Sequence, residues 1–310
     1  MISIVVPTYK RAWALSFSLE SLAKQSTPPD EVVVVLKPSN DRSESIIHKF
    51  AKELPIKLVI QTKGFFVDAV QLGINNSSGD IILFIDDDAI AEPNFVEKYK
   101  NFFECVRDAG GATGIVFKAY LEKGRLIKKT TEHFIPFNVA RRVQYRRPLK
   151  VFERYSGWVS KSGLCTTTVI ESGDVVLSAL LCGANMGFIR EAIEGCPLNR
   201  LYKGSRKGFN NESLLAYFAK IKGFNTYKIL NPSIAPTVWH LTHKSHLTLK
   251  DDFWSEFWIS YDIFKNYFRY KKMGADVSFL SWIEMCISNL RKQTPAKVLA
   301  LLYTLLDIHR

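Results

Sequence analysis

Residues 83–94 read LFIDDDAIAEPN, and this stretch places Asp86, Asp87 and Asp88 directly after a run of apolar residues. Three carboxylates this close together repel one another unless a positive group lies among them or solvent screens them. A solvated acidic turn and a cation site both satisfy this requirement. The residues on either side of the triplet therefore decide how it is interpreted.

The residues before the triplet alternate between strand and helix patterns. Short apolar runs predict four buried strands, with amphipathic segments between them, at residues 2–8, 31–36, 57–62 and 80–85. Buried strands separated by helices are typical of an α/β fold with a mostly parallel sheet flanked by helices. The triplet would then follow the fourth strand, at the sheet edge where open α/β folds bind ligands.

The pattern loosens after residue 118. Residues 119–160 carry many charges, including the basic run ARRVQYRRPLK at 140–150, and predict a mobile excursion from the core. Residues 172–193 predict a strand, a glycine turn and a helix, and residues 210–224 predict another helix. We expect one α/β domain over residues 1–245 and a helical, aromatic and basic C-terminal extension over residues 246–310.

The extension contains an aromatic stripe at helical spacing, formed by Trp254, Phe257, Trp258, Tyr261, Phe264 and Phe268. Basic residues flank the stripe, so one interpretation is a helix lying at an anionic membrane surface. The other interpretation is a helix that docks its aromatic face on the main domain, since a core face needs the same pattern. We favour docking.

The composition of the 310-residue chain limits its class. It is 47% hydrophobic with a net charge of +12, which is typical of a globular protein with an acidic partner such as a nucleotide, nucleic acid or anionic membrane. The five cysteines form no CxxC pair, which favours a reducing compartment. We find neither a signal peptide nor an apolar run of about 20 residues, and expect a cytoplasmic protein, with peripheral association at the inner membrane face as an option.

The spacing of Asp86 and Asp88 suits a hard divalent cation, which prefers oxygen ligands and often retains phosphate oxygens in its shell. We therefore hypothesise that the positive group is a metal ion that also binds a diphosphate. Aspartate-phosphorylating phosphatases place a similar pair after a strand. Ile90 stands where those enzymes typically carry Thr or Val, and their strand lies near the start of the fold.

Several segments in order resemble family-2 glycosyltransferases of the Rossmann-like GT-A fold, in particular prokaryotic enzymes that build cell-surface glycans. They are IVVPTYKR at 4–11, LFIDDDAIAEPNF at 83–95, CGANMGFIREAI at 182–193, NNESLLAYFAKIKGF at 210–224 and VWHL at 238–241. The resemblance implies a nucleotide-sugar donor, either UDP-, GDP- or dTDP-linked, and Mn²⁺ or Mg²⁺ as cofactor. It also implies inverting transfer to a glycan or lipid-linked saccharide.

The resemblance also assigns donor-binding residues. Those near the nucleoside are Pro7, Thr8, Tyr9, Arg11, Lys63, Gly64 and Asp68. Asp86 would hold the ribose and Asp87 would face the sugar, while a turn at the donor sugar or the acceptor would contain Gly183, Ala184 and Asn185. The residue types allow plainer interpretations, because Tyr9 can be a packed loop aromatic and Asn185 can cap a tight turn.

By the same resemblance, Asp88, Asp86 and His240 would bind the metal, and Glu212 would be the general base. Glu212 also fits a glutamate that is favoured at a helix N-terminus by the helix dipole. His243 and His246 follow His240 with spacing that a zinc site could use, but we expect one functional histidine.

Two segments depart from the family pattern. Leu36, Lys37 and Pro38 stand where relatives carry acids that read the donor base, and Asn211-Glu212 replaces a Glu-Asp pair. The identity of the base is therefore open. A catalytically inactive glycan-binding relative is an alternative. A nucleic-acid-binding protein is another, but the acidic triplet argues against it and we expect no nucleic-acid partner.

Overall fold

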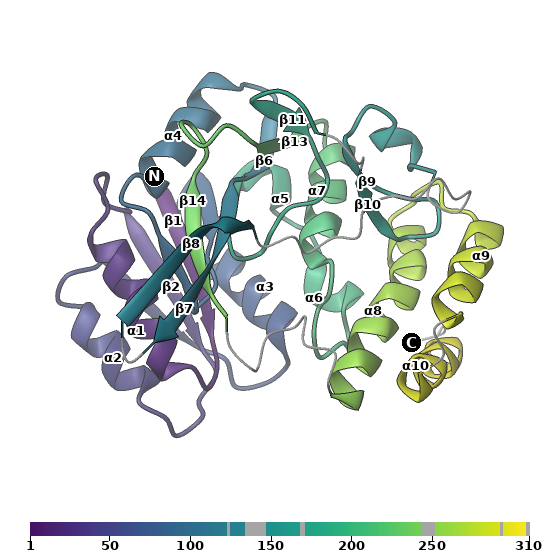
Figure 1. Cartoon of the computed structure of the whole chain (residues 1–310), viewed down its shortest axis with the longest axis horizontal. Coiled ribbons are helices and arrows are strands. Elements are labelled where there is room, and N and C mark those ends of the chain that lie inside the picture. Colours follow the sequence, from purple (N-terminus) through teal and green to yellow (C-terminus); the bar gives the residue numbers. More distant parts are fainter. Residues whose placement is uncertain (123–124, 134–146, 168–170, 243–251, 292–293, 308–310) are drawn as a thin grey trace.

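The computed structural model describes residues 1–122, 125–133, 147–167, 171–242, 252–291 and 294–307. Figure 1 shows an α/β body with three C-terminal helices packed along one side of it. The predicted boundary at residues 245 and 246 lies outside the described residues, as do His243 and His246.

The N-terminal part has the predicted alternation of strands and helices. Its elements are β1 (Ile2–Thr8), α1 (Ala12–Ala23), β2 (Glu31–Leu36), α2 (Ser43–Phe50), β3 (Ile56–Ile60), α3 (Phe66–Asn76) and β4 (Ile81–Phe84). Strand β1 pairs in parallel with β2 and β4, and β2 pairs in parallel with β3. The carboxyl ends of these four strands therefore meet at one edge of the sheet.

The chain then doubles the width of this sheet. The added elements are α4 (Phe95–Cys105), β6 (Ala109–Thr113), β11 (Val175–Leu177), β12 (Met186–Ile189), α5 (Arg190–Ile193), α6 (Leu198–Leu201), α7 (Asn211–Ile221) and β13 (Asn225–Ile229). The strand order is β11-β13-β6-β12-β4-β1-β2-β3. Strand β12 runs antiparallel to both of its neighbours, and β11 runs antiparallel to β13, so the mostly parallel sheet has a mixed half.

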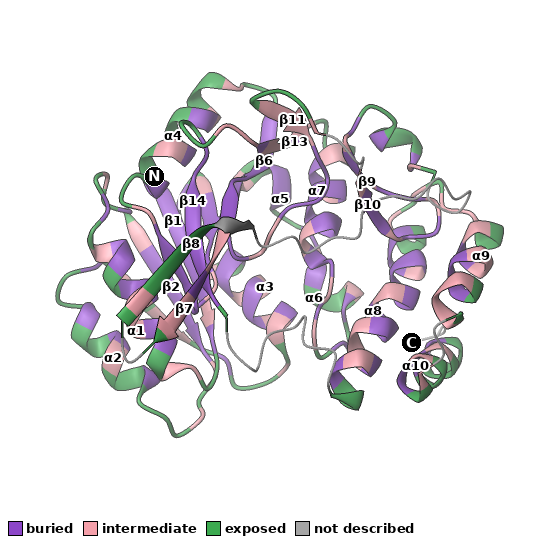
Figure 2. Ribbon diagram, in the orientation of Figure 1, coloured by how far each residue is buried: buried purple, intermediate pink, exposed green. Residues whose placement is uncertain are grey.

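Helices cover both faces of the sheet, which explains why its strands lack a polar alternation. Val5 and Val33 point to the face covered by α3 and α7, whereas Ile4 and Val34 point to the face covered by α1 and α2. All four side chains are inaccessible to solvent. Full burial of such a side chain contributes about 1.5–3 kcal/mol, and Figure 2 shows the resulting buried centre.

A second, smaller sheet lies beside the first and corrects the prediction of a loose excursion after residue 118. It has the order β5-β14-β7-β8, formed by β5 (Ala89–Ala91), β14 (Thr237–Leu241), β7 (Ile115–Glu122) and β8 (Arg125–His133). Strands β7 and β8 form an antiparallel hairpin. Lys128, Lys129 and Thr130 of β8 are exposed at the sheet edge, and their polar side chains hide the strand signal.

The next segment also contains regular structure. It comprises η2 (Lys150–Phe152), β9 (Gly157–Val159) and β10 (Cys165–Thr167), and the last two pair antiparallel. Most of the basic run at 140–150 falls outside the described residues, which resume at residue 147.

The extension consists of α8 (Phe253–Lys272), α9 (Phe279–Leu290) and α10 (Pro295–Leu306). Asp252 caps α8 and Thr294 caps α10. Phe257, Tyr261 and Phe264 of the aromatic stripe are buried, but this face packs mainly against α9 and α10 rather than on the main domain as predicted, and Trp254 is 57% exposed. Within the described residues, no helix combines the length and apolar character needed to cross a bilayer.

Candidate active site

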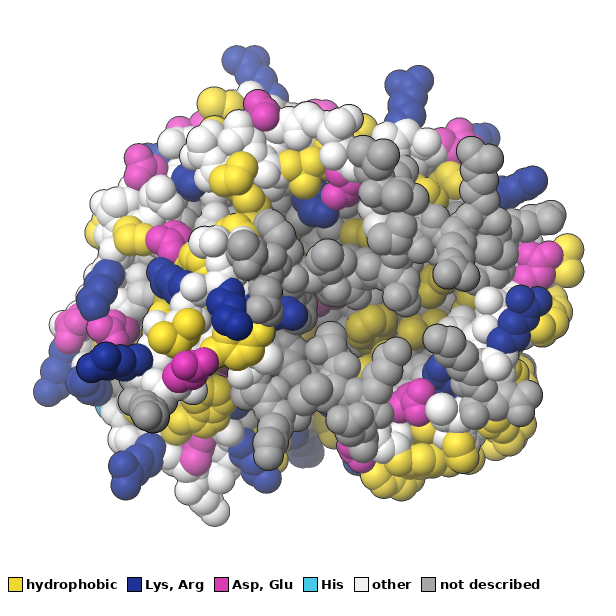
Figure 3. All heavy atoms as spheres, viewed as in Figure 1, with side chains coloured by type: hydrophobic (Ala, Val, Ile, Leu, Met, Phe, Trp, Pro, Cys, Tyr) yellow, Lys and Arg dark blue, Asp and Glu magenta, His cyan; other side chains and the backbone are white. Residues whose placement is uncertain are grey.

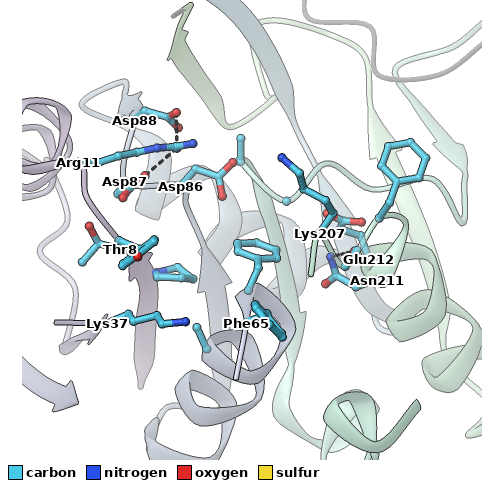
Figure 4. A pocket seen from close by; sticks show the side chains of 18 of the residues that line it. Thr8, Arg11, Lys37, Phe65, Asp86, Asp87, Asp88, Lys207, Asn211 and Glu212 are labelled. Carbon is cyan, nitrogen blue, oxygen red and sulfur yellow. Dashed lines mark hydrogen bonds and ion pairs between the residues drawn. The ribbon is translucent and has the colours of Figure 1, made fainter. Parts of the chain in front are cut away.

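A pocket of about 480 Å³ opens at the carboxyl ends of β1 and β4. One wall contains Pro7, Thr8 and the aspartate triplet, and the facing wall contains Gly183 and residues 206–212. Figure 4 shows the triplet and Glu212 on opposite sides of this space. The pocket thus lies at the edge of the sheet where the position of the triplet predicted a ligand site.

The triplet occupies the turn in which the chain leaves the main sheet after β4 and enters the small sheet at β5. The backbone N–H of Ile85 donates to the carbonyl of Val5 at 3.2 Å, and the N–H of Ala89 donates to the carbonyl of Asp86 at 3.0 Å. Asp87 and Asp88 are only 4% and 1% exposed. The backbones of two sheets therefore fix the direction of the acidic side chains, which excludes the solvated acidic turn.

Arg11 supplies a positive charge that the sequence did not pair with the triplet. Its Nη1 lies 3.0 Å from Asp87 Oδ1 and 2.5 Å from Asp88 Oδ2 (Figure 4). Burial raises the pKa of Asp87, and the charge of Arg11 opposes that shift. Arg11 lines the pocket as expected, but its guanidinium contacts the acids, and Asp87 is occupied by this ion pair.

His240 completes the acidic wall from β14. Antiparallel pairing sets His240 opposite Ala89, and its Nε2 lies 3.5 Å from Asp86 Oδ2 and 3.4 Å from Asp88 Oδ1. Burial lowers the pKa of His240, but the two carboxylates outweigh burial and raise it overall. One ligand atom from each of Asp86, Asp88 and His240 lies within 4.8 Å of the other two. The two carboxylates suit a hard divalent ion such as Mn²⁺ or Mg²⁺, and the imidazole could supply a third ligand atom.

Glu212 lies on the facing wall, in the first turn of α7. Asn210 precedes the helix in a left-handed conformation with φ 66°, which turns the chain into the pocket. A Cβ atom at Gly183 would lie 2.7 Å from Glu212 Oε1, so the absence of a side chain at Gly183 makes room for this carboxylate. Burial, with a contribution from Asp86, raises the pKa of Glu212 to about 7. Such a pKa suits a general base.

Four predicted site residues do not line the pocket: Lys63, Gly64, Asp68 and Asn185. Asp68 Oδ2 accepts the N–H of Phe65 at 2.7 Å and so caps α3. The carbonyls of Lys63 and Gly64 accept hydrogen bonds from Gln61 Nε2 at 3.0 Å and Lys37 Nζ at 2.7 Å. Their partners Phe65, Gln61 and Lys37 all line the pocket, so these three residues contact the lining without belonging to it.

Asn185 is fully buried between the two sheets. Its Nδ2 donates to the carbonyls of Ile115 at 3.0 Å and Pro236 at 2.9 Å, and its Oδ1 accepts from the hydroxyl of Tyr99 at 2.7 Å. The turn that contains Gly183 and Ala184 reaches the pocket, and Asn185 anchors that turn.

The structure adds pocket residues that the resemblance did not assign, among them Lys37, Phe65, Arg206, Lys207 and Asn211. The Nζ of Lys37 lies 5.2 Å from the ring centroids of both Phe65 and the predicted residue Tyr9. Within the described residues, the buried Oδ1 of Asn211 has no hydrogen-bond partner. The sequence marked Lys37 and Asn211 only as departures from the family pattern, whereas Arg206 and Lys207 gave no signal beyond their charge.

Comparison with curated proteins identifies relatives of the N-terminal part. An uncharacterized glycosyltransferase, YwdF of Bacillus subtilis (strain 168), is 38% identical over 100 residues, which are 31% of this chain and 36% of that protein. A validoxylamine A glucosyltransferase of Streptomyces hygroscopicus subsp. limoneus is 33% identical over 101 residues, which are 31% of this chain and 22% of that protein. The chain thus matches well under half the length of these relatives.

Solved structures match nearly the whole chain. S. aureus TarS in complex with UDP-GlcNAc has a TM-score of 0.60 at 14% identity, covering 99% of this chain and 80% of that one. The mannosyltransferase PcManGT from Pyrobaculum calidifontis, in complex with GDP-Man and Mn²⁺, has a TM-score of 0.53 at 14% identity, covering 100% and 81%. At this identity the likeness shows the fold, which confirms the predicted GT-A class.

The sequence model of glycosyl transferase family 2 matches residues 3–161, slightly more than half of the chain, including β1, β4 and the aspartate triplet. The family, the fold and the pocket at the strand ends agree with one another. The chain belongs to glycosyl transferase family 2.

Proposed function

We propose that this enzyme uses Mn²⁺ or Mg²⁺ to transfer a sugar, with inversion, from a nucleotide-sugar donor to a glycan or lipid-linked saccharide. The observation that carries the proposal is one pocket with two facing acidic walls. Asp86 and Asp88 stand beside His240 on one wall, and Glu212, with its pKa raised to about 7, stands on the other. The complexes of TarS with UDP-GlcNAc and of PcManGT with GDP-Man and Mn²⁺ support the class of donor and cofactor.

Asp86, Asp88 and His240 would hold the divalent ion, which supplies charge neutralisation to the diphosphate leaving group when bound. Asp86 would also bond the ribose, as the resemblance implies. Arg11 keeps Asp88 directed into the pocket and holds Asp87 by the same guanidinium. Lys207, on the facing wall, adds a positive charge that attracts an anionic donor.

The nucleoside would bind among Pro7, Thr8, Tyr9 and Phe65, where two aromatic rings offer flat faces. Lys37 lies between these rings and can only donate hydrogen bonds, so it would pair with a carbonyl oxygen of the base. UDP-, GDP- and dTDP-linked donors all carry such an oxygen, and the panel of donors in the experiment below separates them.

Glu212 would accept the proton of the acceptor hydroxyl as the oxygen attacks the anomeric carbon. Its place opposite the metal-ligand wall suits inversion, because the attacking oxygen and the leaving diphosphate occupy opposite faces of that carbon. Gly183 leaves space for the carboxylate, and the buried Oδ1 of Asn211 would accept a hydrogen bond from a sugar hydroxyl.

Donor turnover tests the assignment of Glu212. Hydrolysis or transfer is measured with Mn²⁺ and with Mg²⁺ for UDP-glucose, UDP-GlcNAc, GDP-mannose and dTDP-glucose. The Glu212→Gln variant should bind the same donor and turn it over about 10²–10⁴-fold more slowly. A variant with the full wild-type rate would remove Glu212 from the mechanism. Donor binding without any turnover by the wild type would instead favour an inactive relative.

We place the reaction in the cytoplasm at the inner face of the membrane, where a lipid-linked acceptor would be presented. The support is apolar surface on the outer sides of α9 and α10, where Leu280, Ile287, Leu302, Leu305 and Leu306 are exposed. Figure 3 shows apolar side chains gathered at the lower right, over the region of α10. The exposed Lys271 and Lys272 at the end of α8 add charge that favours anionic lipid.

A further inference from the structure

The wall that carries Glu212 is built from a segment with little regular structure. Between α6 and α7, residues 202–210 turn repeatedly and contribute Arg206 and Lys207 to the pocket. Such a segment has no ladder of strand hydrogen bonds to fix it. The contacts that fix this segment therefore determine the position of the first turn of α7, and with it the position of Glu212.

A buried aspartate of α8 binds this segment at two points. Asp262 is fully buried, and its Oδ2 accepts the hydroxyl of Ser205 at 2.8 Å and the backbone N–H of Phe209 at 2.9 Å. Ser205 Oγ in turn accepts the N–H of Gly208 at 2.9 Å. One carboxylate oxygen thus closes the segment into a compact turn directly before α7.

Arg269, about two turns further along α8, holds Asp262 in place. Its Nη2 lies 2.7 Å from Asp262 Oδ1, and its Nε donates to the carbonyl of Leu201 at 3.1 Å. The guanidinium also stacks 3.7 Å above the ring of Tyr202. Burying two charges is costly unless they are paired and their other hydrogen-bonding atoms are used, and both conditions are met here.

A second contact from α8 reaches the same wall independently. The guanidinium of Arg206 lies 5.0 Å from the ring centroid of Trp258 on α8 and 5.6 Å from that of Phe65 beside α3. Arg206 therefore links the C-terminal extension to the nucleoside side of the pocket. The stacking of a guanidinium between two rings favours one orientation of this side chain.

We propose that Asp262 and Arg269 are positioning residues of the active site, which hold residues 201–209 so that Glu212 and Lys207 face the acidic triplet. This inference rests on the function proposed above. It makes α8 a functional part of the glycosyltransferase unit, although α8 lies far outside the residues that match the family.

The extension itself offers a matched control. Asp307 is also buried, and its Oδ2 accepts the hydroxyl of Tyr261 at 2.6 Å and lies 2.9 Å from Lys265 Nζ. This ion pair joins α8 to the end of α10, whereas Asp262 binds the segment directly before α7. Asp262→Asn and Asp307→Asn therefore make the same chemical change in the C-terminal extension, at two different contacts.

Hydrogen exchange of the full chain tests the contact without any substrate. Asp262→Asn should speed the exchange of the amides in residues 202–212 by about tenfold or more, because it weakens a charge-assisted bond to the Phe209 N–H. Asp307→Asn should leave these amides unchanged. Equal exchange in the wild type and in Asp262→Asn would overturn the inference.

Steady-state hydrolysis of the donor used by the wild type, with Mn²⁺, tests the consequence. Asp262→Asn should lower kcat by about tenfold or more and change the donor KM by less than about threefold, because the metal-ligand wall is untouched. Ser205→Ala, which removes both hydrogen bonds of the Ser205 hydroxyl and keeps the ion pair, should give a smaller loss of kcat and serves if Asp262→Asn fails to fold. Asp307→Asn should retain wild-type values.

The experiments distinguish failure of the positioning role of Asp262 from failure of the proposed function. Wild-type kcat in Asp262→Asn and Ser205→Ala, together with a large loss in Glu212→Gln, would refute the positioning role and leave the proposed function intact. Full activity in Glu212→Gln would refute the proposed base, while the exchange result would still decide whether α8 holds the segment.

Discussion

The two walls of the pocket differ in how the fold positions them. The metal-ligand wall, with Asp86, Asp88 and His240, is attached to strands whose backbone pairing fixes each side chain. The base wall, with Glu212, follows an irregular segment that is held by side chains of α8. The proposed metal ligands therefore stand on or directly beside paired strands, whereas the proposed base follows a segment whose anchor lies in the C-terminal extension.

If the two walls have different roles, a substitution in one wall should weaken nucleotide binding, and a substitution in the other should leave binding unchanged. Asp88→Ala should weaken Mn²⁺-dependent nucleoside diphosphate binding by about 100-fold or more, because it removes a proposed metal ligand. Glu212→Gln should retain wild-type affinity. Titration calorimetry with UDP and with GDP measures both variants.

Asp80→Ala is the control, because Asp80 is an exposed carboxylate at the opposite end of β4, where its Oδ2 lies 2.9 Å from the N-terminal amino group. It should bind nucleotide like the wild type. An unchanged nucleoside diphosphate affinity in Asp88→Ala would contradict the proposal that the aspartate wall binds the donor.

Gly183 lies where the two walls approach each other, so its substitution sharpens the comparison. An added Cβ would lie 2.7 Å from Glu212 Oε1 and would push the carboxylate away. Gly183→Ala should therefore lower kcat by roughly 10–100-fold, since small displacements of reacting groups are expensive. Nucleotide affinity, measured in parallel, should remain within about threefold of the wild type. A larger loss of affinity than of kcat would assign Gly183 to donor binding.

The pH dependence of turnover reports on the base wall. Glu212 must be ionised to accept a proton, and its pKa is raised to about 7, mainly by burial. The value of kcat/KM should therefore rise with pH through about 7 and level off above it. Glu212→Gln should lose this rise in its residual activity. A profile that is flat between pH 5.5 and pH 8.5, values chosen to bracket that pKa by about 1.5 units, would contradict the assignment.

The same pKa predicts a change in stability. The pKa of Glu212 rises from 4.5 to about 7 on folding, so between pH 4.5 and about pH 7 the folded protein keeps Glu212 protonated while the unfolded chain has lost that proton. The free energy of unfolding therefore falls as the pH rises through this range. Above about pH 7 the folded protein carries the full destabilising effect of the buried carboxylate. In metal-free buffer, Glu212→Gln should match the wild type near pH 4.5 and be more stable at pH 8 by about 1–3 kcal/mol. Urea unfolding at both pH values measures the difference, and equal stability at pH 8 would argue against a buried, costly carboxylate.

The smallest expected effect concerns the outer surface of the extension. The double variant Leu302→Glu, Leu306→Glu should bind vesicles of phosphatidylcholine and phosphatidylglycerol roughly a few-fold more weakly. Both side chains are exposed on α10, and the substitutions replace apolar surface by negative charge. Ile221→Glu, which alters an exposed apolar residue of α7, is the control and should have no effect. Absence of vesicle binding by the wild type would remove the membrane from the proposal.

The sequence indicated the strand ends and the aspartate triplet more clearly than the contacts that hold the opposite wall, for a physical reason. Buried strands and a charged triplet leave local signals, and β1, β2 and β4 lie within a few residues of their predicted positions. The pairing of Arg11 with Asp87 spans 76 residues and leaves no such signal. The contact between Asp262 and Phe209 spans 53 residues and joins segments that look independent along the chain.

The structure differs from the sequence predictions at two other places, because the same local sequence pattern occurs in more than one kind of structure. Asn185 beside a glycine turn is typical both of a ligand-binding residue and of an anchor, and in this protein it bonds the two sheets to each other. The hairpin of β7 and β8 was predicted as an excursion because its exposed edge is too polar to show a strand period. In both cases the tertiary surroundings, rather than the local sequence, decide the outcome.

The most direct test of the central claim is a crystal of the enzyme soaked with Mn²⁺ and UDP or GDP, measured at the manganese absorption edge. We expect one anomalous peak among Asp86, Asp88 and His240, with the diphosphate bound to the ion and Glu212 across the pocket. A pocket without manganese, or a nucleotide bound with no ion at these three residues, would contradict it.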